Sequence, residues 1–188
     1  MPAEPGFGLF NIITAKSLYI SHDARAKSVT LNIEHCNAVL ADLPDSALAP
    51  LQRVLHAAAR FVADIGPRDH ITPTLASLHW LPVRQRIIYK LCTVMHSVVH
   101  GQAPSYIYDI VTPVTRLPSR ANLQSAHQGN YDVPRVATGL GQRSFAVAGP
   151  KAWNSLPSEL RCIAVDSTFR RRLKAELFSR AYGVSHDI

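Results

Sequence analysis

The sequence predicts a mainly α-helical domain with a minor β-hairpin in its C-terminal third, which makes the fold class mainly α with a small α+β element. Three long segments carry apolar residues at steps of three and four, the period of an amphipathic helix. With 47% hydrophobic residues and a mean hydropathy of +0.02, the chain is too apolar to be disordered throughout. Its 188 residues are enough for one domain with a sizeable core, or for two small subdomains that share one.

The first helix is predicted over residues 49–64, where the polar side chains fall between apolar ones at helical spacing. Its apolar positions are Leu51, Val54, Leu55, Ala58, Phe61, Val62 and Ile65. Gly66 and Pro67 follow. We expect Gly66 to end this helix in a left-handed conformation, since glycine adopts it without steric cost and proline cannot continue the helix.

A short helix is predicted after Thr72 and Pro73, and Pro82 is expected to open a longer one that ends at Gly101. The longer helix has an apolar stripe wide enough to predict burial over much of its circumference. The stripe consists of Val83, Ile87, Ile88, Leu91, Cys92, Met95, Val98 and Val99. Residues 103–111 are expected to add a turn or two, with Tyr106, Ile107 and Ile110 pointing inward.

The C-terminal third is predicted to hold a hairpin and a last helix. Residues 131–133 and 144–147 alternate polar with apolar side chains, and Gly139 and Gly141 lie between them, which is typical of two short strands and a turn. The last helix is expected over residues 167–182, with Asp166 or Ser167 as N-cap and Gly183 after its end. Its predicted core face is Phe169, Leu173, Leu177 and Ala181.

These elements divide the chain into five regions. Residues 1–32 show no clean periodicity and are expected to be a poorly ordered arm, and residues 33–112 form a helical region. Residues 113–129 are a predicted linker, because Pro, Ser, Thr, Asn and Gln prevail in them without a period. Residues 130–182 hold the hairpin and last helix, and residues 183–188 are a tail.

A formal charge of +7 favours polyanionic partners such as nucleic acid or an acidic membrane face. RNA or DNA would be bound weakly and without sequence preference. Between residues 133 and 182 nine basic residues stand against three acidic ones. A solvated basic surface that binds nothing would give the same composition, and both interpretations stay open. The predicted nucleic-acid-binding residues are Arg84, Arg86, Lys90, Arg143, Lys151, Arg170, Arg171, Arg172 and Lys174.

Motifs for catalysis or for a cofactor do not occur. The sequence contains no Gly-x-Ser-x-Gly elbow and no phosphate-loop lysine, and we therefore expect neither catalytic residues nor a cofactor. His96 and His100 stand four apart on one predicted helix face, but the sequence nominates no further metal ligand. Trp80 and Trp153 each precede a helix beside apolar neighbours, which favours core packing over stacking on a base.

Three separated cysteines, Cys36, Cys92 and Cys162, argue against a disulfide framework and for a reducing compartment. The first residues lack the pattern of a secretory signal, and no apolar run approaches the length that spans a bilayer. We expect a nuclear or cytoplasmic protein with no membrane partner.

Two blocks carry a family resemblance, 78–86 (LHWLPVRQR) and 153–161 (WNSLPSELR). Between and around them, uncommon residues recur in a fixed order. They include Cys36, Asn37, Leu51, Gln52, Arg53, Asp69, His70, Ile71, Thr72, Pro73, His100, Gly101, Ala103, Pro104, Val133, Pro134, Arg135, Pro150, Ser167 and Phe169. In this order and spacing, residues 33–182 resemble the C-terminal tail region of the reverse transcriptases (RNA-directed DNA polymerases) of non-LTR, LINE-type, jockey-like retrotransposons.

The resemblance implies an origin rather than an activity, since in that family the polymerase precedes this region. A polymerase needs adjacent aspartates to hold two metal ions, and no Asp-Asp pair occurs in this chain. We therefore expect a non-catalytic remnant of a reverse transcriptase tail whose basic helix faces bind RNA or DNA. The alternatives are a module that packs on an upstream polymerase domain or self-associates, and a pseudogene product without a selected role.

Overall fold

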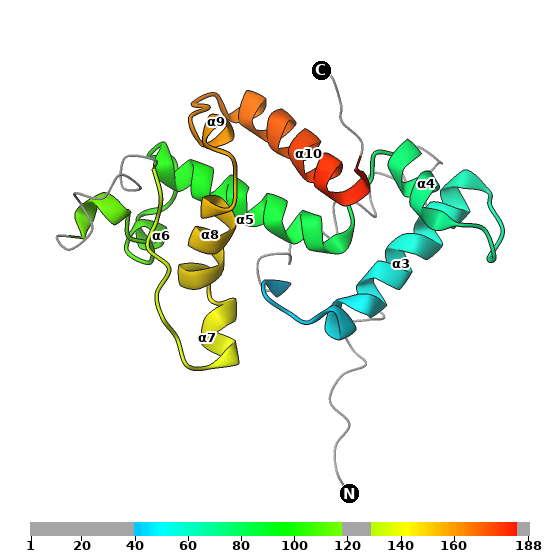
Figure 1. Ribbon diagram of the computed structural model, residues 1–188, viewed down its shortest axis with the longest axis horizontal. Coiled ribbons are helices and arrows are strands. Elements are labelled where there is room, and N and C mark those ends of the chain that lie inside the picture. Colours follow the sequence, from blue (N-terminus) through cyan, green and yellow to red (C-terminus); the bar gives the residue numbers. More distant parts are fainter. Residues whose placement is uncertain (1–39, 118–128, 184–188) are drawn as a thin grey trace, which may run out of the picture.

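The computed structural model describes residues 40–117 and 129–183, and this part of the chain is mainly helical, as predicted (Figure 1). The predicted arm, most of the linker and the tail beyond Gly183 lie outside these residues. The long helices are α3 (Asp45–Ala63), α5 (Val83–Val99), α8 (Phe145–Asn154) and α10 (Asp166–Tyr182). Shorter elements are α4 (Ile71–Ser77), α6 (Ser105–Tyr108), η2 (Val114–Arg116), α7 (Gly139–Arg143) and α9 (Ser158–Arg161).

Helix α5 is the centre of the fold. It contacts α3, α8 and α10, and in Figure 1 it runs between α10 on one side and the start of α3 on the other. Six of the eight residues of its predicted apolar stripe are at most 5% exposed, namely Val83, Ile87, Leu91, Cys92, Met95 and Val98. Ile88 is only half-buried, and Val99 is 38% exposed, so the predicted burial of Val99 is wrong: it is the last residue of the helix. The predicted helical region (33–112) and the predicted C-terminal region (130–182) contribute to one hydrophobic core, which includes residues from Ala41 to Phe178.

Helix α3 begins at Asp45, four residues before the predicted start, and continues through Pro50. Its end also differs from the prediction. Asp64 adopts the left-handed conformation, with φ at 50°, and its backbone N–H donates a hydrogen bond to the Arg60 carbonyl. Gly66 instead donates its N–H to the Asp69 carboxylate at 2.7 Å, in a turn that leads toward α4. The helix is shorter than predicted at this end because an aspartate supplies the left-handed cap before Gly66 is reached.

The apolar stripe of α3 is only partly buried in the core. Leu55 and Ala59 are fully buried, whereas Val54 is 40% and Phe61 57% exposed, so their predicted place in the core is wrong. Hydrophobic residues cover more than half of this helix, and α4 and α5 cover only one side of it. Periodicity identified the helix, but it could not tell which part of a broad apolar face meets a partner.

Gln52 of α3 caps the central helix. The first backbone N–H of α5, at Val83, donates to Gln52 Oε1 at 3.0 Å, while Gln52 Nε2 lies 2.7 Å from His56 Nε2. Pro82, the expected first residue of this helix, is its N-cap instead and has no side-chain oxygen to offer. A residue 31 positions earlier therefore supplies the acceptor that the local sequence lacks.

The two tryptophan blocks are part of the core, as predicted. Trp80 is 8% exposed, and its carbonyl accepts a hydrogen bond from the Tyr182 hydroxyl at 2.6 Å. Trp153 is 1% exposed and donates its indole N–H to the Gly129 carbonyl at 3.1 Å. In each block the following proline is an N-cap, Pro82 for α5 and Pro157 for α9.

The predicted hairpin is wrong. Residues 144–147 belong to α8 and its N-cap, and Gly139 and Gly141 lie in α7 rather than in a turn between strands. The strand-like contact in the described residues is an isolated antiparallel bridge between Pro113 and Tyr131. Alternation over four residues is too short to exclude a helix, and the apolar run continues at helical spacing to Trp153, which packs on the core.

Helix α10 packs its predicted face on the core. Phe169, Leu173 and Leu177 are fully buried, Phe178 joins them, and Ala181 is half-buried. The N-cap is Val165 rather than Asp166 or Ser167, so the helix starts one residue early. Gly183 ends it in the left-handed conformation, with φ at 66°, as predicted.

In the segment after α5, two of the three side chains that were predicted to point inward are exposed. Ile107 of α6 packs against the core, but Tyr106 is 65% and Ile110 43% exposed. Helix α6 has only four residues, and its contact with the core is made by Ile107 and Tyr108, which leaves Tyr106 outside. Ile110 lies beyond the end of the helix.

We predict that Gln52→Ala lowers the free energy of unfolding by about 1 kcal/mol, because the first N–H of α5 loses its acceptor. Arg53→Ala, next to it on the exposed side, is the control and should change stability by less than about 0.5 kcal/mol. Urea unfolding followed by circular dichroism measures both. Equal stability of the two variants would show that Gln52 does not cap α5.

Candidate nucleic-acid interface

The predicted cations of α10 lie on the outside of the molecule. Arg170, Arg171, Arg172 and Lys174 are all exposed, while Phe169 and Leu173 between them are completely buried. The helix is thus fixed along one side, and its cations must point to solvent.

These four cations do not all face the same way. Residues four apart lie on one side of a helix and residues two apart on nearly opposite sides. Arg170 and Lys174 therefore share one flank, Arg172 lies on the other, and Arg171 lies between. The surface they form is a broad cationic band around the exposed half of α10.

The cations of this band differ in whether they form ion pairs. Arg170 donates its Nε–H to Asp166 Oδ2 at 2.7 Å, and Arg180, near the end of the helix, pairs with Glu176 at 2.7 Å. Arg171, Arg172 and Lys174 form no ion pair or side-chain hydrogen bond with any other residue in 40–117 or 129–183. They are the cations most available to an external anion.

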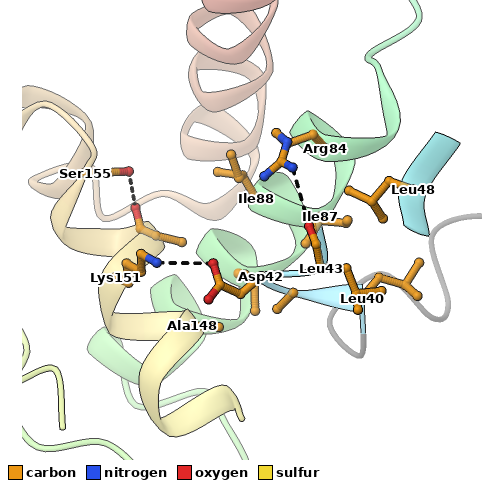
Figure 2. Close-up of a pocket in the computed structure, with 13 residues that line it drawn as sticks. Leu40, Asp42, Leu43, Leu48, Arg84, Ile87, Ile88, Ala148, Lys151 and Ser155 are labelled. Atoms are coloured by element: carbon orange, nitrogen blue, oxygen red, sulfur yellow. Dashed lines mark hydrogen bonds and ion pairs between the residues drawn. The ribbon is translucent and has the colours of Figure 1, made fainter. Parts of the chain in front are cut away.

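Arg84 and Lys151 line different sides of a second place, a groove of about 290 Å³ between α5, α8 and the residues around the start of α3 (Figure 2). Its floor is apolar, with Ile87, Leu91 and Ala148 among the lining residues. Arg84 pairs with Asp45 at 2.5 Å and Lys151 with Asp42 at 3.2 Å. Both cations are therefore already neutralised, which makes this groove a weaker anion site than α10.

The remaining predicted residues are scattered. Lys90 is exposed on α5, and Arg143 is half-buried at the end of α7. Arg86 is only 5% exposed, so its predicted place on the polar side of α5 is wrong. It donates its Nε–H to the Leu81 carbonyl at 2.7 Å. A buried guanidinium that holds the chain before α5 is a structural residue, and it is not accessible to a phosphate.

Next to the band, His96 of α5 is completely buried where α5 meets α10. Its Nε2 donates to the Ile163 carbonyl at 2.8 Å, and its ring stacks on Phe169 with centroids 4.1 Å apart. Its Nδ1 lies 3.7 Å from Asp166 Oδ1. Burial is the largest influence on the pKa of His96 and lowers it, and His100 and Arg170 act in the same direction. The Ile163 carbonyl and Asp166 oppose that shift.

His96 and His100 do lie side by side, with ring centroids 4.3 Å apart. Among the described residues, however, no group of three or more His, Cys, Asp or Glu side chains has the arrangement of a metal site. Cys92 is buried, and burial raises the pKa of its thiol to about 12, which keeps it protonated and unreactive at neutral pH.

Sequence reasoning missed the acids that decide which cations are free. Asp166 with Arg170 and Glu176 with Arg180 have the i, i+4 spacing of helical ion pairs and could have been found. Asp42 with Lys151 could not, because 109 residues separate them. Gln52 and Asp45 belong to the same group of long-range partners.

Comparisons with known proteins give no match, whether the chain is compared with protein-family models, with curated proteins or with solved structures. The resemblance to reverse transcriptase tails therefore stays a prediction. No helix among the described residues combines the length and the apolar character needed to cross a bilayer.

We predict that stability falls as the pH drops below the ordinary histidine pKa of 6.5. Burial lowers the pKa of both His56 and His96 in the folded chain, with Arg60 adding to the effect at His56. The unfolded chain therefore binds protons that the folded chain does not, and folding loses up to about 1.4 kcal/mol per pH unit for each such histidine.

Urea unfolding at about pH 8, 6.5 and 5.5 measures this dependence. His96→Gln keeps an amide N–H for the Ile163 carbonyl but cannot titrate, so its stability should fall less steeply. A wild-type stability that stays constant or rises between pH 6.5 and 5.5 would contradict the assignment.

Proposed function

We propose that the chain binds single-stranded or double-stranded nucleic acid, weakly and without reading its sequence, through the cationic band of α10. The observation that carries this proposal is the exposure of Arg171, Arg172 and Lys174, without ion pairs among the described residues, on a helix whose other side is completely buried. Phosphate contacts from such side chains neutralise charge and release counterions, but they carry no base information.

The packing of α10 on the core supports this function. Its buried face fixes the backbone, so binding would order only the long cationic side chains and not the helix itself. Less entropy is then lost on binding than when a disordered basic segment folds on its target. Stacking of bases on the two tryptophans is not part of the proposal, since both rings are in the core.

We also propose, from the resemblance, that the chain is a non-catalytic remnant of a retrotransposon reverse transcriptase tail. The supporting residues are the two tryptophan blocks and the ordered motif residues around them. Three of the motif residues make long-range hydrogen bonds in the fold: Gln52 of α3 to Val83 of α5, Trp80 to Tyr182 of α10, and Trp153 of α8 to Gly129. Their role in the fold does not depend on an active site.

A second candidate function is a packing module for another polypeptide, either an upstream polymerase domain or a second copy of this chain. The observation that favours it is the exposure of Val54 and Phe61 on α3, at 40% and 57%. A contiguous exposed apolar patch is typical of a surface that meets a partner, and residues seven apart lie on the same side of a helix. Self-association that is insensitive to salt, measured by sedimentation, would support this candidate over the first.

We predict that replacing Arg170, Arg171, Arg172 and Lys174 by Gln weakens binding to single-stranded oligonucleotides and leaves the fold intact. The slope of log K against log salt should become shallower by about 0.7 for each phosphate that the variant no longer neutralises on a single strand, and by about 0.9 on duplex. Fluorescence anisotropy between about 50 and 200 mM salt measures the slope.

The matched control replaces four other exposed arginines by Gln, namely Arg53, Arg68, Arg116 and Arg135. Both variants have the same net charge, so a general electrostatic attraction would weaken both equally. Equal weakening, or unchanged binding in the α10 variant, would show that the band is only a solvated surface.

We predict that the chain gives no primer extension with Mg²⁺ or Mn²⁺, because no adjacent carboxylate pair is present to hold two metal ions. Incorporation of labelled nucleotide on a primed RNA or DNA template is the assay. Template-dependent product above that of the heat-denatured protein would overturn the proposal of a non-catalytic chain.

A further inference from the structure

Where α5 meets α10, two buried acceptors face each other without a proton between them. His96 is completely buried, and its Nε2 carries the hydrogen that the Ile163 carbonyl accepts at 2.8 Å. In the neutral ring, Nδ1 is therefore a lone pair, and it lies 3.7 Å from Asp166 Oδ1. Neither atom has a hydrogen-bond partner in the described part of the chain.

The same carboxylate holds a cation of the α10 band. Asp166 Oδ2 accepts from Arg170 Nε at 2.7 Å, so one oxygen faces the imidazole and the other the guanidinium. The other titratable group at this junction is His100, whose ring lies beside that of His96. Phe169 covers the remaining face of His96.

A proton on Nδ1 would convert this contact from two acceptors into a donor and an acceptor. The charge on the ring would then attract Asp166 and repel Arg170, two groups that are otherwise held together. Conversely, a phosphate that binds Arg170 would compete with Asp166 for the guanidinium and leave the carboxylate more available to His96.

We propose that Asp166 is shared between His96 and Arg170, so that proton uptake by His96 and phosphate binding by Arg170 favour each other. The proton comes from solvent, adds to Nδ1 and is held by Asp166 Oδ1. The part of this proposal that concerns phosphate binding by Arg170 (the phosphate half) rests on the proposed function. The part that concerns proton uptake by His96 (the proton half) depends only on the contacts between α5 and α10. Linkage requires that the two effects be reciprocal, so nucleic acid must bind more tightly as His96 gains its proton.

The proton half is tested in the free protein by following the His96 ring resonances in NMR spectra against pH. Arg170→Gln removes the repelling cation and frees Asp166, so the His96 pKa should rise. Asp166→Asn removes the attracting anion, so the pKa should fall. Substitution should be tolerated at both positions, because their side chains are 48% and 37% exposed, and thermal melts verify the fold.

Glu176→Gln is the matched control. It breaks the other i, i+4 ion pair of α10, with Arg180, and changes the net charge by the same amount as Asp166→Asn. It should leave the His96 pKa where it is in the wild type. Shifts of equal size and sign in the two variants would mean that His96 senses only net charge and would overturn the proposal, as would an unchanged or lower pKa in Arg170→Gln.

The phosphate half is tested with a single-stranded oligonucleotide at about pH 7.5 and pH 5.5. Wild-type affinity should rise as the pH falls, with at most about one proton taken up per complex at His96. Asp166→Asn frees Arg170 at every pH, so it should bind roughly 1.5- to 5-fold more tightly at pH 7.5, the worth of one exposed ion pair. Its affinity should also depend less on pH than that of Glu176→Gln.

The two halves fail separately. No oligonucleotide binding at either pH overturns the proposed function and the coupling to phosphate, while the NMR titrations still decide whether Asp166 and Arg170 set the proton affinity of His96. Binding with the same pH dependence in Asp166→Asn and Glu176→Gln overturns the coupling alone.

Discussion

The burial of α5 between three other helices is the constraint on which the rest of the described structure depends. A helix covered on several sides needs hydrogen-bond partners for most of the polar groups that it buries, because an unpaired buried polar group costs roughly 1 to 3 kcal/mol. Arg86 finds the Leu81 carbonyl, Thr93 the Tyr89 carbonyl and His96 the Ile163 carbonyl. The first N–H of the helix finds Gln52 on α3. The last two of these bonds join α5 to the chain before α10 and to α3.

The functional surface follows from this arrangement. Because α10 buries Phe169, Leu173 and Leu177 against the core, the arginines between them have no room inside and point outward. Acids on the same helix then neutralise Arg170 and Arg180, which leaves Arg171, Arg172 and Lys174 as the exposed cations of the band that lack ion pairs in the described structure. The same packing places His96 beside Asp166, so the buried core and the cationic surface share one carboxylate.

The sequence was most informative where one physical pattern dominated. The face of α10 was predicted nearly residue by residue, because that helix has one period and one buried side. Most of the apolar stripe of α5 was predicted too, but not the exposure of Val99 or the burial of Arg86, because α5 has neighbours on several sides. The hairpin failed because alternation at Phe145 and Val147 is too brief to separate a strand from the helix that these residues form with Trp153. The predicted burial of Val54 and Phe61 was wrong for another reason: periodicity identifies an apolar helix face but not which part of that face a neighbouring element covers.

The candidate site could be predicted only in part. Exposure of the α10 cations follows from their spacing relative to the core residues, whereas the burial of Arg86 depends on Trp80, Leu81 and Tyr182 meeting at one place in the fold. Lys151 and Asp42 form an ion pair between positions 109 residues apart, and no local sequence pattern predicts such a contact.

The most direct test is whether α10, and with it the cationic band, is folded in the free chain. Hydrogen exchange of the α10 backbone amides measures this in the free chain and in the complex with an oligonucleotide. If α10 is held by its buried face, its amides are protected in the free chain to the same degree as those of α5, and the oligonucleotide adds little to that protection. Exchange of α10 at the rate of an unfolded segment in the free chain, with protection appearing only in the complex, would contradict the account.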